Sequence, residues 1–496
     1  MTKASAGLRA VATLPPPREP VGWPAWRLRE EVASGRLGVV DVVQAHLDRL
    51  DEVQPWLNAV VAVRRGAALA DAEAIQSRLD AGQAAGPLCG VPFTAKDVVA
   101  TAGVPTCCGS AAFGGNVPEV DAVAVGRLRA AGAVLIAKTN CPELAFGVTT
   151  DNETYGATRS PWGFHSPGGS SGGEAALLAV GASALGVGTD YGGSLRWPAQ
   201  CCGVLALRPG VGAVDGTGQL PERGGRMDGR PGPAYGSDSV QRHFQVIGPL
   251  ARSVADLATA LAVMQGADPA AVSSAFTGSN PIRPELLEGV RIGWVSREDT
   301  QAVGAGVSSV LRAVVSGMSV AGVATEPVEG LLDGLHGIFN ALRATDPMND
   351  LRAAIGLRSG CLGAAARAVL DTAPQSSADP APLWASLRRR RDEVMAQLAV
   401  TPVVLFPVSP APACDLEGSG DVDGQHVEGF ALMAQCRAVS ALGVPALSIP
   451  VGSDRHGLPV AIQVLASPGG EQLLLLVGRM LERLYGGRQE PPWLDR

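Results

Sequence analysis

Lysine is almost absent from this chain of 496 residues. Lys3, Lys96 and Lys138 are the three lysines, and every other basic residue is an arginine. The 40 basic and 47 acidic residues give a formal charge of -7, and the longest basic run, four arginines at 388–391, is shorter than the about five to eight residues typical of a nucleic-acid patch. The sequence therefore lacks the electrostatic features of a protein that binds nucleic acid or an anionic membrane. We expect a small neutral or polar partner, with no nucleic acid and no membrane.

Long hydrophobic runs and metal-binding spacings are missing as well. The longest weakly polar stretch, residues 175–188, is shorter than the about 18 to 20 residues of a membrane span and contains three glycines. The apolar piece at residues 10–14 is too short for the core of a signal peptide. None of the nine cysteines shows C-x-x-C spacing, and the six histidines show no paired spacing. These absences predict packed, reduced thiols, no metal site and a cytoplasmic location.

Helix and strand signals alternate along the chain. Asp41 with Gln44 is typical of a capping box that opens a helix, and Asp121 predicts the start of another helix that ends at Gly132. A buried strand at 133–137 follows that second helix directly, which favours an α/β layer architecture. Further strands are expected at 403–406, 447–451 and 460–465, a closing helix at 471–484, and loops at 215–238, 373–382 and 415–424. Length alone would favour two or three domains.

Two segments rich in glycine and serine lie downstream of Lys96. The first, 168–173, reads Gly-Gly-Ser-Ser-Gly-Gly, which is most often a flexible linker. Here it leads into an apolar, helix-like run at 175–180, so its amides would point from a helix N-terminus into a site suited to an anion or oxyanion. The second segment ends in Gly192-Gly193-Ser194 and, taken alone, reads as a turn with a buried serine. A buried lysine can lose its proton and act as a base, which arginine cannot.

Two other classes of protein also fit parts of this pattern. Residues 168–172 satisfy G-x-S-x-G, the nucleophile elbow of α/β-hydrolase esterases, in which Ser170 would attack. That scheme leaves Lys96 and Ser194 unexplained, and its base would be one of His243, His336, His426 and His456. A binding module whose glycine loop cradles phosphate is disfavoured because no G-K-[ST] follows the loop.

The chain resembles the amidase signature family, whose members hydrolyse carboxamides with a Ser-Ser-Lys triad. The resemblance is carried by both glycine-serine segments and by motifs at 86–92, 96–97, 137–140, 248–257, 443–446, 450–452 and 457–460. It implies one large α/β catalytic domain over 21–490, with a central mixed β-sheet flanked by helices on both faces, after a loose N-terminal tail at 1–20. It also implies a small-molecule amide substrate and no cofactor. Dimers are frequent among similar proteins, so a homodimer is one candidate assembly.

Residue roles follow from the same resemblance. It implies that Ser194 is the nucleophile, Ser170 the bridging serine after a cis peptide bond, and Lys96 the base. The relay requires neutral lysine, so burial must lower the pKa of Lys96 from about 10.4 toward about 7 to 8. The resemblance further implies an oxyanion hole built from the backbone amides of Tyr191, Gly192, Gly193 and Ser194, with supporting roles for Ser171, Asp190 and Arg196.

Some positions depart from the family pattern. Arg208 stands where lysine is common, and Ser160 stands where asparagine is common. Trp197 occupies a position where the A subunit of tRNA-dependent glutamine amidotransferases typically has glutamine, which weakens that alternative. Its indole could line an acyl pocket or pack in the core. The 211–245 and 270–400 regions match no subfamily, so the acyl group, the amine and the choice between hydrolysis and acyl transfer stay open.

Overall fold

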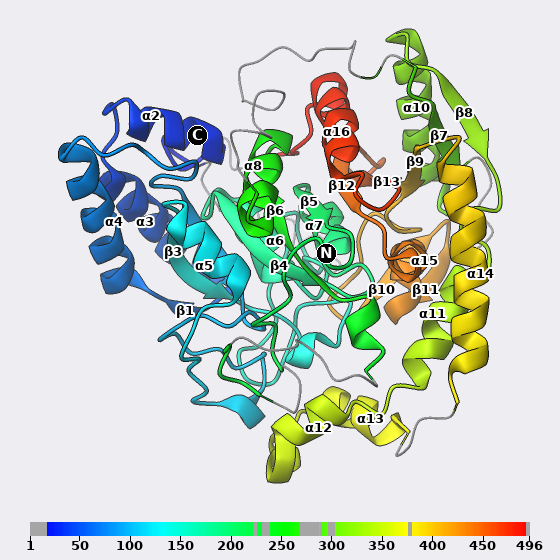
Figure 1. Ribbon diagram of the computed structural model, residues 1–496, viewed down its shortest axis with the longest axis horizontal. Helices are drawn as coiled ribbons and strands as arrows, with labels where there is room; N and C mark the ends of the chain where they lie inside the picture. The colour runs from blue at the N-terminus through cyan, green and yellow to red at the C-terminus, as the bar shows by residue number, and fades with distance from the viewer. Residues whose placement is uncertain are drawn as a thin grey trace, which may run out of the picture.

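One mixed β-sheet runs through the whole molecule (Figure 1). The structure, a computed structural model, describes residues 17–221, 226–230, 239–267, 287, 289–295, 303–374 and 379–492. Within these ranges the sheet has eleven strands, which in spatial order are β1 (Val60–Val63), β3 (Val134–Thr139), β2 (Pro92–Lys96), β4 (Leu185–Asp190), β6 (Val246–Ala251), β5 (Leu205–Arg208), β12 (Ala446–Ser453), β13 (Pro459–Ala466), β9 (Val403–Pro407), β7 (Ile292–Val295) and β8 (Thr325–Val328).

The pairing directions decide where the polar strand ends meet. β2 pairs in parallel with both β3 and β4, and β7 pairs in parallel with both β9 and β8. The neighbouring pairs from β4 to β9 are antiparallel. Because β2 and β4 run the same way, Lys96 at the end of β2 and Asp190 at the end of β4 reach the same edge of the sheet.

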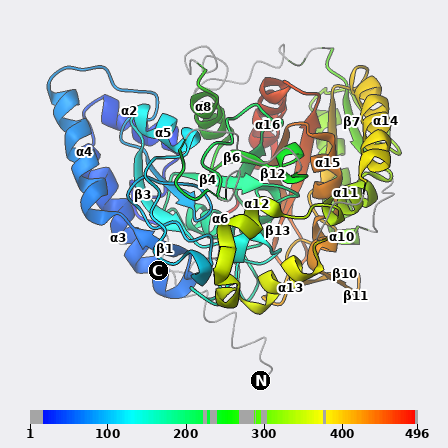
Figure 2. The ribbon, with the colours of Figure 1, turned by 60° about the horizontal axis from the view of Figure 1, so that its bottom comes forward.

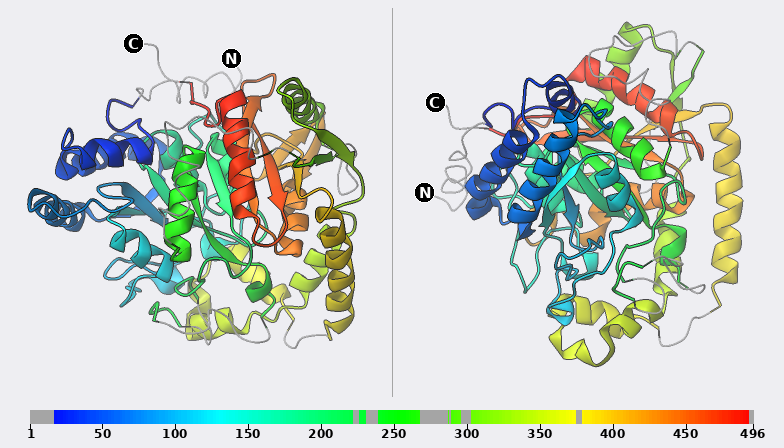
Figure 3. Two further views of the ribbon diagram at one scale, coloured as in Figure 1. Left: turned by 45° about the horizontal axis from the view of Figure 1, so that its top comes forward. Right: turned by 60° about the vertical axis from the view of Figure 1, so that its left-hand side comes forward.

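Helices cover both faces of the sheet. Ser448 of β12 donates to the Arg196 carbonyl of α7, whereas the preceding residue, Leu447, faces Gly478 of α16. Consecutive strand residues point to opposite faces, so α7 and α16 lie on opposite sides. α8 lies beside α16 on the same side (Figure 3). The α-helices are α2 (Ala25–Ala33), α3 (Val39–Leu57), α4 (Arg65–Asp80), α5 (Val123–Ala130), α6 (Gly172–Ala179), α7 (Arg196–Cys202), α8 (Val254–Gln265), α10 (Ala305–Val320), α11 (Leu335–Ala344), α12 (Asn349–Ile355), α13 (Ala364–Thr372), α14 (Ala381–Leu398), α15 (Ala434–Leu442) and α16 (Glu471–Tyr485).

Short 3₁₀ turns and one separate hairpin complete the described fold. The turns are η1 (Ala111–Phe113), η2 (Glu143–Ala145), η4 (Gln241–His243), η6 (Gly356–Cys361) and η7 (Gly429–Met433). The hairpin joins β10 (Ser419–Val422) to β11 (Gln425–Glu428). In Figure 2, α12 and α13 lie toward the viewer, with α12 in front of the sheet, while α14 runs along the side that carries β7. No helix in the described ranges has the length and hydrophobicity needed to cross a bilayer.

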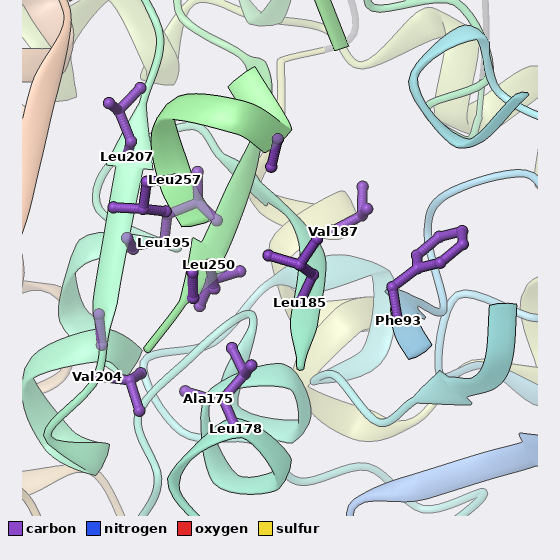
Figure 4. Close-up of a cluster of buried hydrophobic side chains, with 14 of the residues drawn as sticks. Phe93, Ala175, Leu178, Leu185, Val187, Leu195, Val204, Leu207, Leu250 and Leu257 are labelled. Carbon is purple, nitrogen blue, oxygen red and sulfur yellow. The ribbon is translucent and has the colours of Figure 1, made fainter. Parts of the chain in front are cut away.

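The centre of the sheet is the apolar core. Figure 4 shows leucine and valine side chains of β4, β5 and β6 together with Ala175 and Leu178 of α6. These side chains are buried on both faces of the sheet, as expected for a layered α/β protein. The predicted fold class, a central mixed sheet flanked by helices, is therefore confirmed. Residues 1–16 of the predicted N-terminal tail lie outside the described ranges.

Two helix starts differ from the prediction. α3 begins at Val39, two residues before Asp41, and the Val39 amide donates to Gln76 Oε1 of α4 at 2.8 Å. A partner from another helix therefore satisfies an amide at this helix start, where the sequence predicts a local capping box. α5 begins at Val123, because the Asp121 carboxylate instead accepts from the Ala102 amide at 2.8 Å and from Arg129.

The expected loop at 415–424 is also wrong in part, because it contains β10. Asp423 and Gly424 both have positive φ, at 52° and 87°, and they connect β10 to β11. An Asp-Gly pair between two strands is a strong hairpin signal, which composition alone does not reveal. Parts of the two other expected loops, 222–225, 231–238 and 375–378, lie outside the described residues.

Candidate active site

The first glycine-serine segment forms the buried N-terminus of a helix. Residues 168–174 are all buried, the Gly169–Ser170 peptide bond is cis, and α6 begins at Gly172. β4 lets this helix approach closely, since a Cβ at Gly186 would lie 2.5 Å from Glu174 Oε2. A Cβ at Gly188 would lie 2.8 Å from Ser171 Oγ. The segment is therefore not a flexible linker. The two glycines of β4 leave room for the start of α6, which places Ser170 at the edge of the sheet.

Lys96 reaches Ser170 directly. Its Nζ donates to Ser170 Oγ at 2.6 Å and to Thr189 Oγ1 at 3.0 Å, and the lysine side chain is fully buried. Burial lowers the pKa of Lys96 to about 8, against the opposing effect of nearby anionic groups that include Asp190 and Glu174. A lysine with this pKa is neutral in about one molecule in ten at pH 7.

Thr189 is a partner of Lys96 that the motifs did not single out. It lies on β4, one residue after Gly188, in parallel pairing with the β2 strand that carries Lys96. In the sequence, the one feature that could have identified Thr189 is its position in the second glycine-serine segment. That its hydroxyl faces the lysine follows from the register between β2 and β4.

Ser194 and Ser170 line the same cavity, which encloses about 90 Å³. The Ser171 amide donates to the Ser194 carbonyl at 3.2 Å, which joins the two glycine-serine segments. The Ser171 hydroxyl donates to the Thr189 carbonyl at 3.4 Å. Ser194 is 8% exposed, and its hydroxyl makes no hydrogen bond with another described residue. The structure therefore brings Lys96, Ser170 and Ser194 to one site.

The backbone amides before Ser194 divide into two groups. The Gly193 amide donates to Asp190 Oδ1 at 2.8 Å, so it is already occupied. Within the described ranges, the amides of Tyr191, Gly192 and Ser194 have no acceptor. Three of the four expected oxyanion donors are therefore available to a ligand, and the fourth holds the loop in shape.

A buried ion cluster supports this loop. Asp190 pairs with Arg196 at 3.0 Å and with Arg208 at 3.4 Å, and all three side chains are inaccessible to solvent. Burial alone would raise the pKa of Asp190, but the charges of Arg196 and Arg208 outweigh burial and lower it. Arg196 also donates to Gln463 and Ser440, while Arg208 donates to the Asp190 carbonyl at 2.8 Å. Asp190 and Arg196 thus hold the loop that carries Ser194 without lining the cavity.

A second group of buried ionisable side chains surrounds Lys96. Glu174 accepts hydrogen bonds from the hydroxyls of Thr94 and Thr139 at 2.5 and 2.8 Å, and burial raises the pKa of Glu174 to about 7. Lys138 donates to the Val99 carbonyl and to Thr101, and burial lowers the pKa of Lys138 to about 8. Two of the few lysines, Lys96 and Lys138, are therefore buried amines. Of these two, only Lys96 contacts a serine of the site.

Trp197 belongs to the core. Its side chain is fully buried and its indole Nε1 donates to the Val148 carbonyl at 2.9 Å. Trp197 does not line the cavity of Ser194. Of the two interpretations left open for this indole, the structure supports core packing.

The four candidate histidines of an esterase elbow lie elsewhere. His243 packs against Trp384 with tilted rings, and His336 contacts Asn340. His426 and His456 are near Ser419 and Arg455. None of the four lines the described cavity, and Lys96 occupies the hydrogen-bonding position beside Ser170. The geometry does not support the elbow scheme. In the described ranges no three His, Cys, Asp or Glu side chains gather as metal ligands would.

The nine cysteines behave as predicted, because all are free thiols and eight are buried. Cys361, in η6, is the exposed one. Burial raises the pKa of Cys141, near Lys96, to about 12, so this thiol stays protonated at neutral pH.

This arrangement defines a hydrolase of the amidase class, and the chain belongs to the amidase family. The family model described as Amidase matches residues 41–341 and 371–475. Among curated relatives, the A subunit of the glutamyl-tRNA(Gln) amidotransferase of Nitratidesulfovibrio vulgaris is 33% identical over 491 residues, 92% of this chain and 95% of the relative. The same-named protein of Carboxydothermus hydrogenoformans is 29% identical, over 92% and 96% of the two chains.

Solved structures share the fold. A 6-aminohexanoate cyclic dimer hydrolase complexed with substrate has a TM-score of 0.77 at 26% identity, over 96% of this chain and 98% of that one. A structure described as "An unexpected vestigial protein complex reveals the evolutionary origins of an s-triazine catabolic enzyme" has a TM-score of 0.79 at 28% identity, over 94% and 99%. The resemblance inferred from the motifs is therefore confirmed at the level of family and fold.

Proposed function

We propose that this protein is an amidase that hydrolyses a linear carboxamide through an acyl-enzyme on Ser194. The observation that supports this most is the 2.6 Å contact from Lys96 Nζ to Ser170 Oγ, beside a cavity that Ser170 shares with Ser194. A nucleophile, a hydroxyl able to relay a proton and a buried amine are the parts that such a reaction needs.

The proton relay follows from these contacts. Neutral Lys96 accepts the Ser170 hydroxyl proton, and Ser170 accepts the proton of Ser194 as Ser194 Oγ attacks the amide carbonyl carbon. The C–N bond breaks when the same relay returns a proton to the departing nitrogen. Water then attacks the acyl-enzyme by the same sequence, which releases the carboxylic acid and restores Ser194.

Backbone amides stabilise the tetrahedral intermediate in this proposal. The amides of Tyr191, Gly192 and Ser194 are available to the developing oxyanion, while the Gly193 amide is bound to Asp190. Removal of one such donor typically costs about 10² to 10³ in rate. Ser171, Asp190 and Arg196 act through the loop rather than on the substrate.

The test is amide turnover by matched variants, measured as release of amine from a set of linear amides. Ser194→Ala is expected to abolish turnover, and Ser170→Ala and Lys96→Met to reduce it by about 10³ or more, since triad members act as a unit. Ser309→Ala, at an exposed serine of α10, is the control that keeps full activity. An active Ser194→Ala variant would contradict the proposal.

A second candidate is the A subunit of a tRNA-dependent glutamine amidotransferase. Similarity of about 30% over nearly the whole length to curated A subunits favours it. For such a subunit we expect turnover that depends on partner chains, whereas the amidase proposal predicts turnover of simple amides by the purified chain alone. Amide hydrolysis by the chain alone favours the first candidate, and ammonia release from glutamine only after addition of partner subunits favours the second.

A further inference from the structure

Two arginines lie together on the cavity wall near the nucleophile loop. Arg437 comes from α15 and Arg343 from α11, two helices that pack against each other, and both line the cavity that holds Ser170 and Ser194. Both guanidiniums lie over the ring of Phe430, at 3.9 Å for Arg437 and 5.5 Å for Arg343. Two like charges therefore share one aromatic ring.

Arg437 is buried without a counter-ion. This residue is 6% exposed, and its Nη1 donates to Asn340 Oδ1 at 2.7 Å. Its Nε has no hydrogen-bond partner, and no carboxylate of the described residues forms an ion pair with Arg437 or Arg343. Burial, followed by the charge of Arg343, lowers the pKa of Arg437 to about 9. A buried charge that is neither paired nor fully hydrogen-bonded is costly.

Arg208 and Arg252 also have a buried Nε without a partner, but the rest of each guanidinium is better satisfied. Arg196 and Arg208 both contact the Asp190 carboxylate, and Arg252 donates to three backbone carbonyls. Arg437 differs because its guanidinium makes one hydrogen bond within the described residues, has no carboxylate partner there and lies on the cavity wall. A ligand anion is the group that would complete this environment.

The acidic residues of the cavity do not supply that anion. The Asp346 carboxylate accepts the amides of Val240 and Met348 at 2.8 Å and of Gln241 at 3.3 Å. Asp350 also lines the cavity and has an interaction of its own. Among the described residues neither carboxylate forms an ion pair with the two arginines, so both guanidiniums lie on the cavity wall without a carboxylate partner.

Arg437 also lies close to the reacting groups. A Cβ on Gly192 would be 3.0 Å from Arg437 Cγ, so the arginine stem packs directly on the loop that carries the available amides. Gly192 is two residues from Ser194. An anion bound by this guanidinium would therefore be only a short chain of atoms away from an amide carbonyl at Ser194.

We propose that the cavity selects an amide that bears a carboxylate, which Arg437 and Arg343 bind while the amide carbonyl reaches Ser194. This inference rests on the proposed amidase function and specifies its substrate class. A carboxylate would bind the Arg437 guanidinium, whose hydrogen bond within the described residues is to Asn340, and would lie between two repelling cations. Charge-assisted bonds of this kind correspond to about ten- to hundredfold in kcat/KM between an anionic substrate and its neutral isostere.

The experiment compares matched substrates with one charge of difference. Glutaric acid mono-4-nitroanilide is paired with the 4-nitroanilide of pentanoic acid, which places the charge on the acyl side. 4-Butyramidobenzoate is paired with butyranilide, which places it on the amine side. We expect kcat/KM of the anionic member to exceed that of the neutral member at least about tenfold in one pair. Equal or lower values for the anionic member in both pairs would overturn the inference.

Variants assign the preference to the arginines. Arg437→Gln and Arg343→Gln should each lower the anionic-to-neutral ratio, and Arg437→Lys should restore part of it. Arg312→Gln, at an exposed arginine of α10, removes the same charge and should leave the ratio unchanged. A ratio that persists in both glutamine variants would refute the assignment. Fluorophosphonate labelling confirms that each variant retains a reactive site.

Failure of the two proposals can be told apart. If the parent protein neither labels nor hydrolyses any of the four amides, the amidase function fails. If it labels and hydrolyses the neutral amides as well as the anionic ones, only the carboxylate preference fails.

Discussion

Raising the pH from 7 to 9 is expected to increase kcat/KM about tenfold, with a plateau above that range. The base in the proposed relay is neutral Lys96, and burial lowers the pKa of this amine to about 8. The active form is the deprotonated one, so activity rises as pH passes upward through this pKa. Because kcat/KM reports the free enzyme, its midpoint follows the pKa of the unliganded site.

The expected magnitude follows from the fraction of neutral lysine. A pKa of about 8 gives about 9% neutral amine at pH 7 and about 91% at pH 9. An amine with the ordinary pKa of 10.5 would be only about 3% neutral at pH 9, and activity would still rise tenfold per pH unit. The two cases therefore differ in the presence of a plateau as well as in absolute rate.

The assay is kcat/KM for a neutral amide from pH 6 to pH 10, with thermal unfolding recorded at each pH. The second-order rate constant for fluorophosphonate labelling is measured over the same pH range as a control. Because labelling involves no amide substrate, a matching profile reports ionisation of the protein. We expect both profiles to have unit slope below about pH 8 and to level off above it. A continued rise to pH 10, or activity independent of pH, would refute the assignment of Lys96 as the base.

Three further predictions concern the scaffold of the site. Asp190→Asn leaves two buried guanidiniums without a carboxylate and should lower the free energy of unfolding by about 3 to 5 kcal/mol, measured in urea titrations. A loss below about 1 kcal/mol would argue against the buried ion cluster. Gly186→Ala should lower the free energy of unfolding by about 1 to 3 kcal/mol, because the new Cβ would lie 2.5 Å from a carboxylate oxygen. Gly337→Ala in α11 is the control, since a Cβ there has open space and should not destabilise the fold. Equal losses of stability in the two variants would contradict the packing around Gly186. A thiol reagent should modify one cysteine, Cys361, in the native protein and all nine after unfolding, and modification of more than one native thiol would show that the others are accessible.

Local patterns predicted much of the sheet and the two serine segments. Short apolar runs such as 403–406 and 460–465 became β9 and β13 with nearly the predicted bounds, because both faces of these strands are buried. The apolar run after Gly173 predicted α6 correctly, since its residues pack on the sheet. The capping residues were less informative, because the Asp121 carboxylate binds the Ala102 amide rather than a helix start.

Features that depend on contacts between distant segments could not be predicted. Arg343 and Arg437 become neighbours only through the packing of α11 against α15, and nothing in either local sequence indicates this. Thr189 faces Lys96 because of a strand register, and Gly193 donates to Asp190 because of a turn. Periodicity describes which face of an element is apolar, but it does not determine which two elements meet.

The most direct test of the proposed mechanism is to locate the nucleophile. The parent protein and the Ser194→Ala, Ser170→Ala and Lys96→Ala variants would be treated with a serine-reactive fluorophosphonate and examined by intact mass and peptide mapping. We predict one adduct, on Ser194, which is absent in Ser194→Ala and forms slowly in the other two variants. An adduct on Ser170, or no adduct on the folded parent protein, would contradict the mechanism.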